Sequence, residues 1–231
     1  SKELELTLTG KDCGLEERAP IRGVPYHAVE GYLSRLVQKG YKVAIAEQME
    51  DPKQARGLVK REVIRVVTPG TLTNSQVLEE SKNNYLMGIV YIDGVFGVST
   101  VDVSTGDYLV TEVRNERSLL DEIYKFSPSE LICNEAFYMS GIDLEDLKVR
   151  LNAVISALEN RFFSDDSCRR ILREHFHVEH LEALGLADYE TGAIAAGAVL
   201  QYLYETQKNT LEHLTRLTVY TTGQFMMLDT S

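Results

Sequence analysis

The chain has 231 residues, of which 44% are hydrophobic and 26% are charged, proportions typical of an ordinary globular protein. This length is enough for one large domain or two smaller ones without disulfides or metal ions to stabilise them. The chain contains no apolar run as long as a membrane-spanning helix, and its three cysteines form no C-x-x-C pair. We therefore expect a soluble, cytoplasmic protein with no disulfide framework, no structural zinc site and no contact with a membrane.

The net charge of −11 is distributed unevenly along the chain. Residues 1–71 contain 12 basic and 10 acidic side chains, whereas residues 72–231 contain 12 basic and 25 acidic ones. Because binding to nucleic-acid phosphates requires local Lys and Arg side chains, only the first third is a candidate DNA-binding segment. The acidic remainder is expected to face away from a duplex.

The first 71 residues are expected to form a small mixed α/β unit. Alternating leucines predict a strand over residues 1–8, and a strand that begins at the first residue suggests a chain cut from a longer protein. Apolar residues at helical spacing predict a helix over His27–Lys39 that ends at Gly40. Three more elements are expected: a largely buried strand (Lys42–Glu47), a short helix after Asp51-Pro52, and a strand (Val59–Val67) on which Arg61 and Arg65 share one face.

The polar residues 72–81 are interpreted as a linker, and strand and helix signals follow it. Three antiparallel strands are expected at Tyr85–Ile92, Val95–Val103 and Tyr108–Val113, because Asp93-Gly94 and a second polar turn separate them as in hairpins. The later elements are expected to be a helix (Arg117–Lys125), a strand (Glu130–Cys133), helices over Leu144–Leu158, Ser167–His175 and Tyr189–Thr206, and strand pieces of a further unit at Leu217–Tyr220 and Met226–Leu228. Gly192 and Gly197 predict close packing of the longest helix.

This order of elements is that of a ribonuclease H-like domain, whose active members hold two divalent metals between converging carboxylates. The first expected strand contains no carboxylate, Asp93 lies in a turn, and Asp102 borders a hairpin. Asn134-Glu135 stands where another carboxylate would follow the fourth strand. The sequence therefore favours a binding module, and a metal-dependent nuclease is the alternative.

Two other patterns lack what their sites require. Gly10-Lys11 is followed by Asp12 instead of Ser or Thr, and no glycine stands five residues earlier, so a phosphate loop is excluded. The histidines between His175 and His180, with Cys168 upstream, lack the spacing of a structural zinc site. We expect no catalytic residue and no metal site in this chain.

Five polar side chains in the first 71 residues are candidate phosphate contacts: Lys11, His27, Arg61, Arg65 and Thr68. Lys11 is expected in a loop, and His27 in the first turn of a helix, where free N–H groups can bind a phosphate. Such residues position a duplex by its backbone and carry little sequence information. The alternative is a solvated face whose cations pair with Glu30, Glu47 or Glu62.

Several runs of residues resemble the bacterial MutS family of DNA mismatch-repair proteins. Those that resemble its N-terminal domain are Gly23–Glu30, Ala44–Gln48, Asp51-Pro52 and Val66–Thr71, preceded by Leu4–Gly10 and Glu17–Pro20. The rest, through Leu200–Tyr204 and Met227–Ser231, is similar to the family's connector domain and the start of its core domain. The resemblance implies an α/β (α+β) fold: a mixed α/β mismatch-binding domain (1–71), a ribonuclease H-like connector with a mixed sheet flanked by helices (82–211), and the start of the core domain (212–231).

The resemblance also implies a fragment of a mismatch sensor. In the family a Phe-x-Glu motif wedges into the mismatch, and none of the seven phenylalanines of this chain has Glu two positions later. Full-length members are dimers that hydrolyse ATP with Mg²⁺ through a C-terminal domain, so this chain is expected to lack enzymatic activity and cofactors. The implied partners are mismatched double-stranded DNA and MutL, which the connector contacts while it relays between the DNA-binding and ATPase domains. A basic patch is the candidate MutL contact: Arg169, Arg170 and Arg173.

Overall fold

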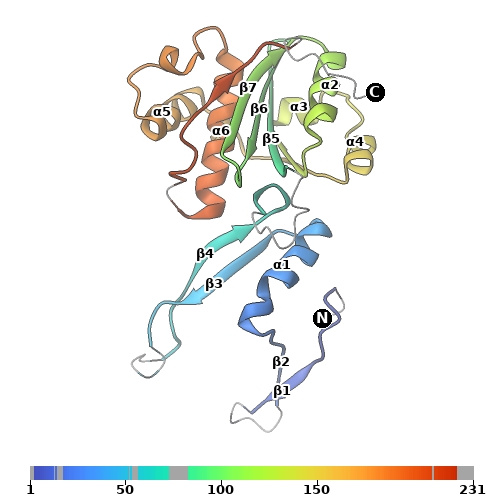
Figure 1. Cartoon of the computed structure of the whole chain (residues 1–231). Helices are drawn as coiled ribbons and strands as arrows, with labels where there is room; N and C mark the ends of the chain where they lie inside the picture. The colour runs from blue at the N-terminus through green and yellow to red at the C-terminus, as the bar shows by residue number, and fades with distance from the viewer. Residues whose placement is uncertain are drawn as a thin grey trace.

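The computed structural model describes residues 3–12, 14, 18–51, 53, 57–72, 83–209 and 211–222. These residues form an N-terminal domain, up to Leu72, and a second domain from Asn83 onward, which we call the connector (Figure 1). The N-terminal domain contains β1 (Thr9–Lys11), β2 (Ala19–Ile21), a 3-10 turn (Tyr26–Ala28), α1 (Val29–Gln38), β3 (Val43–Gln48), β4 (Arg61–Val67) and a 3-10 turn (Pro69–Thr71). The connector contains β5 (Tyr85–Ile92), β6 (Val95–Asp102), β7 (Asp107–Val113), α2 (Glu116–Phe126), β8 (Glu130–Cys133), α3 (Glu135–Tyr138), α4 (Leu144–Leu151), β9 (Val154–Ala157), α5 (Asp165–Phe176), α6 (Glu190–Gln207) and β10 (Thr218–Val219), with 3-10 turns at Asn160–Phe163 and Leu181–Leu184.

The N-terminal domain has a small apolar core between α1 and the β3–β4 hairpin. Leu33 and Val37 of α1 pack with Val67 and Leu72, and all four side chains are at most 6% exposed. The helix ends as predicted, since Gly40 takes a positive φ of 84° and its N–H donates to the carbonyl of Val37. The predicted helix is therefore confirmed in position and in its C-terminal signal.

Two of the strands expected in the N-terminal domain differ from the structure. Residues 3–8 form a turn and an irregular segment, and the first strand begins only at Thr9. A strand needs a neighbour to satisfy its backbone groups, and no described strand pairs with residues 3–8, so the leucine alternation is not used. β3, expected to be largely buried, is half-buried only at Val43 and Ile45 and otherwise exposed, because the two-stranded hairpin covers only one of its faces.

The connector is built on a six-stranded sheet with the order β10-β7-β6-β5-β8-β9. β5, β6 and β7 are antiparallel neighbours, whereas β8 and β9 run parallel to β5. This is the ribonuclease H-like arrangement that the sequence predicted. Figure 1 shows α5 and α6 on one face of the sheet and α2, α3 and α4 on the other, and each face has its own hydrophobic core.

Local signals placed most connector elements correctly. Asp93 and Gly94 both have positive φ values, 48° and 81°, as the tight β5–β6 hairpin requires. The glycines of α6 allow close packing: a Cβ on Gly192 would lie 2.9 Å from Val110 Cγ1, and one on Gly197 would overlap Cys168. Both predictions are confirmed.

The predicted helix over Leu144–Leu158 is wrong in its second half. Asn152 adopts a left-handed conformation with φ of 50° and ends α4, after which β9 pairs in parallel with β8. A parallel pairing is non-local, so helical spacing alone could not reveal it.

The end of the described chain belongs to the connector rather than to a further unit. Leu211, Leu214 and Leu217 are buried in the core beneath α6, and β10 pairs in parallel with β7. The expected boundary at 211/212 therefore cuts through this packing. Three expected features lie outside the described residues: most of the segment after Asp51, the linker over 73–81, and the strand piece at Met226–Leu228.

Candidate nucleic-acid interface and domain junction

Several cations of the N-terminal domain are exposed to solvent, among them Lys11, Arg18, Arg22 and Arg61. Within the part of the chain that the structure describes, none of them lies within ion-pair distance of a carboxylate. Glu62 is one of the carboxylates expected to pair with the candidate residues if they only form a solvated face. It is instead bound by Lys60, whose Nζ lies 2.5 Å from its Oε1. As far as the described residues show, these four cations can approach phosphates without breaking an ion pair.

Three of the five predicted phosphate contacts lie on elements at one end of the molecule. Lys11 ends β1, His27 is exposed in the 3-10 turn that leads into α1, and Arg61 begins β4. Figure 1 shows β1 and β2, the start of α1 and the loop end of the β3–β4 hairpin at the end of the N-terminal domain farthest from the connector. The acidic connector is thus held away from these exposed cations.

Arg61 and Arg65 do not share a face, contrary to the sequence prediction. Ile45 pairs with Arg65 and Ala46 with Val63, so Ile64 is an extra residue in β4. Such a bulge shifts the alternation by one residue and moves every later side chain to the other face. Arg65 accordingly lies on the core side beside Ile45, half-buried, and its Nε has no hydrogen-bond partner among the described residues.

Thr68 is also placed differently from the prediction. Its side chain is fully buried, and its hydroxyl donates to Oε2 of Glu130 at 2.5 Å. The backbone N–H of Thr68 donates to the hydroxyl of Thr71, which caps the short 3-10 turn after β4. Thr68 therefore joins the two domains and is not available to a phosphate.

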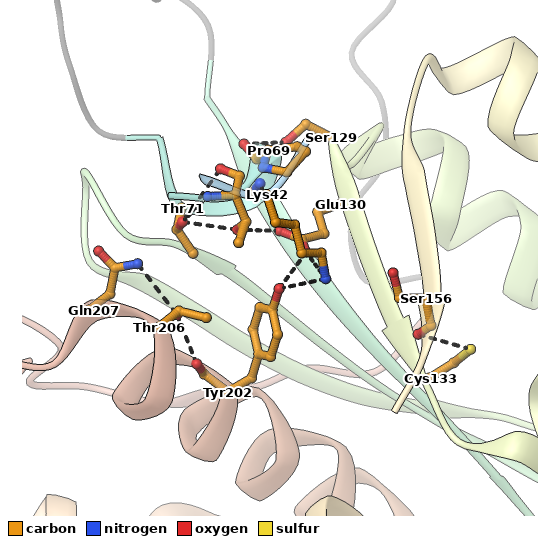
Figure 2. Close-up of polar contacts among 12 residues, drawn as sticks. Lys42, Pro69, Thr71, Ser129, Glu130, Cys133, Ser156, Tyr202, Thr206 and Gln207 are labelled. Carbon is orange, nitrogen blue, oxygen red and sulfur yellow. Dashed lines mark hydrogen bonds and ion pairs between the residues drawn. The ribbon is translucent and has the colours of Figure 1, made fainter. Parts of the chain in front are cut away.

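Glu130, the first residue of β8, is the centre of the junction between the domains (Figure 2). Its side chain is fully buried, and Oε2 accepts hydrogen bonds from Thr68 and from the backbone N–H of Gly70, the latter at 3.0 Å. Oε1 accepts from the Tyr202 hydroxyl at 2.6 Å and lies 3.2 Å from Lys42 Nζ. Both oxygens are thus saturated with donors, as a buried carboxylate requires.

Lys42 and Tyr202 complete this network from opposite sides. The ammonium of Lys42, just before β3, donates to the hydroxyl of Tyr202 on α6 at 3.0 Å and lies 5.2 Å from the centroid of its ring. Burial, followed by the neighbouring Glu130 carboxylate, raises the pKa of Tyr202 well above its ordinary value. The hydroxyl therefore stays protonated and can donate to the carboxylate.

Backbone contacts extend the junction around Pro69. Its carbonyl accepts from Asn84 Nδ2 at 2.8 Å and lies 3.1 Å from the Ser129 hydroxyl, both in the connector. A Cβ on Gly70 would lie 2.9 Å from Leu86 Cβ and 3.1 Å from Glu130 Oε2, so only glycine fits without displacing a neighbour. The Thr-Pro-Gly-Thr turn is therefore packed into the connector and is more than the end of a strand.

Sequence reasoning missed Glu130, Lys42 and Tyr202. One signal was present, because Glu130 opens a strand of otherwise apolar residues, and a charged residue in a buried strand needs partners. The partners lie 62, 60 and 72 residues away in the cases of Thr68, Gly70 and Tyr202. Such distances give no local pattern that could reveal them.

The three arginines of the predicted partner patch lie on α5, but their states differ. Arg169 is bound to Asp165 one turn earlier, at 2.7 Å. Arg170 and Arg173 are exposed, have no ion pair among the described residues, and line a surface hollow of about 400 Å³. Only the last two can therefore offer a free guanidinium to a partner.

In the connector, the positions where an active ribonuclease H-like domain would hold its metal-binding carboxylates have structural roles instead. Gly88 occupies the middle of β5, and Asn134 accepts from and donates to the backbone of Tyr91. Asp102 accepts from the backbone of Ser104 and organises the β6–β7 turn. No three His, Cys, Asp or Glu side chains of the described residues gather where a metal ion could bind, so the nuclease alternative has no support.

The histidine cluster is likewise used in packing. His175 on α5 has Nδ1 2.7 Å from the Tyr204 hydroxyl and Nε2 2.7 Å from the carbonyl of Leu214. Burial lowers the pKa of His175, which favours the neutral ring. Cys168 is buried against α6, with Sγ 3.2 Å from the carbonyl of Phe162.

Comparison with known proteins identifies the family. The family model of MutS domain I matches residues 1–76, and that of MutS domain II matches residues 84–215. The chain belongs to the MutS family. Three relatives, each named DNA mismatch repair protein MutS, are 59% identical (Lachnoclostridium phytofermentans), 47% identical (Acetivibrio thermocellus) and 43% identical (Methanococcoides burtonii) over at least 99% of this chain. The chain spans about a quarter of the length of these MutS proteins, 25% to 26%.

The two matched MutS domains coincide with the two domains of the structure. The match to MutS domain II runs to residue 215, which includes the leucines that pack beneath α6. None of the helices among the described residues is both long and apolar enough to cross a membrane.

Proposed function

We propose that this chain is the part of a MutS protein that holds the DNA backbone beside a mismatch and transmits that contact to the rest of the protein. The longer protein would bind mispaired double-stranded DNA in the cytoplasm and start mismatch repair. The observation that carries the proposal lies at the end of the N-terminal domain far from the connector, where Lys11 and Arg61 are exposed and unpaired among the described residues. Family membership supports the same assignment.

The physical basis is the deformability of a mismatched duplex. A mispaired step is poorly stacked and easily kinked, so a protein can recognise it by shape, with a wedge between the bases. Cations of a small domain then hold the flanking phosphates, each displacing a counterion. An acidic connector on the far side stays off the DNA and leaves the exposed cations of the N-terminal domain as the contact.

This chain has no Phe-x-Glu wedge, so it is expected to bind duplexes weakly and without preference. Fluorescence anisotropy with a labelled G·T heteroduplex and the matched homoduplex tests this expectation. Both should titrate alike, with affinity falling as salt rises. A strong preference for the heteroduplex would place mismatch recognition within these residues. An affinity that does not change with salt concentration would argue against phosphate contacts.

We also propose that α5 contacts MutL through Arg170 and Arg173. Arg170 and Arg173, unpaired among the described residues and beside a hollow on an acidic domain, support this, because a local patch of opposite sign can steer and orient a partner. Calorimetry with MutL should show weaker binding for Arg170→Glu/Arg173→Glu. The matched control is Arg169→Glu on the same helix, whose guanidinium is bound to Asp165. Equal binding by the double variant and the parent would remove α5 from the interface.

ATP hydrolysis with Mg²⁺ and dimer formation are proposed for the longer protein only. This chain is proposed to be inactive as an enzyme and to hold no cofactor. A phosphate-release assay with ATP and Mg²⁺ tests this. ATP hydrolysis that co-purifies with the chain would refute it.

A further inference from the structure

The connector contains two buried glutamates with the same kind of partners. Glu130 is bound by the Tyr202 hydroxyl and the Lys42 ammonium, as described above. Glu122 on α2 is 6% exposed and accepts from the Tyr220 hydroxyl at 2.5 Å, and Lys125 Nζ lies 3.3 Å from the same oxygen. In both trios the ammonium also lies over the tyrosine ring, at 5.2 Å for Lys42 and at 4.5 Å for Lys125.

The two trios differ in what they join. All three members of the Glu122 trio belong to the connector, where they tie the segment after β10 to α2. Three of the four donors to Glu130 come from the N-terminal domain: Lys42, Thr68 and the N–H of Gly70. Only the Glu130 trio therefore crosses between domains.

The Glu130 network adds directional contacts to the packing of β4 and the Pro69–Thr71 turn against the connector. The apolar core of the N-terminal domain, around Leu33 and Val67, is a separate cluster from the cores of the connector. Apolar burial is non-directional, whereas hydrogen bonds and ion pairs hold their partners within narrow angles. A buried ion pair is weak evidence for stability, but it can define a unique arrangement of the groups it joins.

We infer that Glu130 is a positioning residue that fixes the orientation of the N-terminal domain relative to the connector. Its carboxylate holds Lys42 at the start of β3 and the turn after β4, so it fixes both strands of the hairpin at their connector ends. The inference rests on the proposed function in one respect. A contact with DNA at the far end of the hairpin would reach the rest of the protein through this joint.

Distance measurement between two spin labels in the whole 231-residue chain, without DNA, tests the inference. One label replaces Gly31, an exposed position on α1 where a Cβ meets nothing within 4 Å, and the other replaces Val149, 80% exposed on α4. Burial raises the pKa of Cys133 and Cys168 to about 12 each, so these thiols stay protonated and unlabelled. The remaining cysteine, at position 13, is changed to serine.

The expected result is a narrow distance distribution in the parent and one about twofold broader in Glu130→Gln, because orientations that the carboxylate excluded become populated. Glu122→Gln is the matched control. It removes a buried carboxylate of the same kind inside the connector and should leave the width unchanged. An unchanged width in Glu130→Gln, or equal broadening in both variants, would overturn the inference.

A second variant tests the inference in case Glu130→Gln does not fold. Lys42→Met removes the ammonium that reaches Glu130 and keeps an apolar stem against the Tyr202 ring. It carries the same expectation of a broader distribution, and a narrow distribution in a folded Lys42→Met chain would also overturn the inference. Because no DNA is present, the result is independent of whether this chain binds DNA at all.

Discussion

Arg61 and Arg65 offer the sharpest test of the DNA-binding assignment, because sequence and structure disagree about them. The sequence places both on one face of a strand, whereas the bulge at Ile64 puts Arg65 on the core side and leaves Arg61 exposed and unpaired among the described residues. Neutralising Lys11 and Arg61 together should weaken binding to every duplex. Each lost phosphate contact lowers the slope of log K against log salt by about 0.9, so the double variant should lose about 1.8.

This difference is large enough to measure. Over a fourfold rise in salt, a slope change of about 1.8 means that the parent loses about 12-fold more affinity than the Lys11→Ala/Arg61→Ala variant. The assay is fluorescence anisotropy with a homoduplex at several salt concentrations. Arg169→Ala, which removes one cation of the connector that is paired with Asp165, is the control and should leave the slope unchanged.

Arg65→Ala distinguishes the sequence prediction, in which Arg61 and Arg65 share one face of β4, from the structure, in which they lie on opposite faces. It should leave the slope near the parent value, because Arg65 lies beside Ile45 on the core side of the hairpin. Equal slopes in the parent and the Lys11→Ala/Arg61→Ala variant would indicate that these cations belong to a solvated face and do not contact phosphates. A slope loss in Arg65→Ala equal to that of Arg61→Ala would refute the argument from the bulge.

Three further predictions concern the connector. Gly97→Ala should destabilise it by about 3 kcal/mol in urea unfolding, because a Cβ there would overlap the backbone carbonyl of Thr191; a variant as stable as the parent would refute this packing. Cys133 and Cys168 should resist iodoacetamide at pH 8 until the chain is unfolded, because burial raises the pKa of each thiol to about 12; rapid labelling of the native chain would contradict this. Stability should fall as pH drops below 6.5, because burial lowers the pKa of His175 and unfolding then takes up a proton; His175→Gln should flatten this dependence, and an equally steep curve in the variant would assign it to another group.

The sequence by itself determined the elements whose signals are local. The apolar stripe and Gly40 defined α1, Asp93-Gly94 defined the first connector hairpin, and the glycines of α6 indicated close packing. These signals arise from backbone conformations and side-chain periodicities within a few residues, and tertiary contacts did not override them. The order of elements was then enough to predict the ribonuclease H-like sheet.

Only the tertiary structure decided which faces and partners these elements have. β9 is a short strand recognisable by the neighbour it pairs with, β8. β10 lies within the strand piece predicted at Leu217–Tyr220, but its pairing with β7 was not predicted, and the bulge in β4 is defined only by its register against β3. A one-residue slip reverses the faces of a strand without changing its composition, so Arg65 could not be placed from the sequence.

The junction shows the same limit. Glu130 stands in the sequence as a single charged residue in an apolar strand, and Thr68 as a polar residue that ends one. Their hydrogen bond crosses 62 residues, so it exists only once both domains have folded against each other. Because the carboxylate of Glu130 is buried, it needs these donors, and four residues far apart in the sequence, Lys42, Thr68, Glu130 and Tyr202, thereby join the two domains.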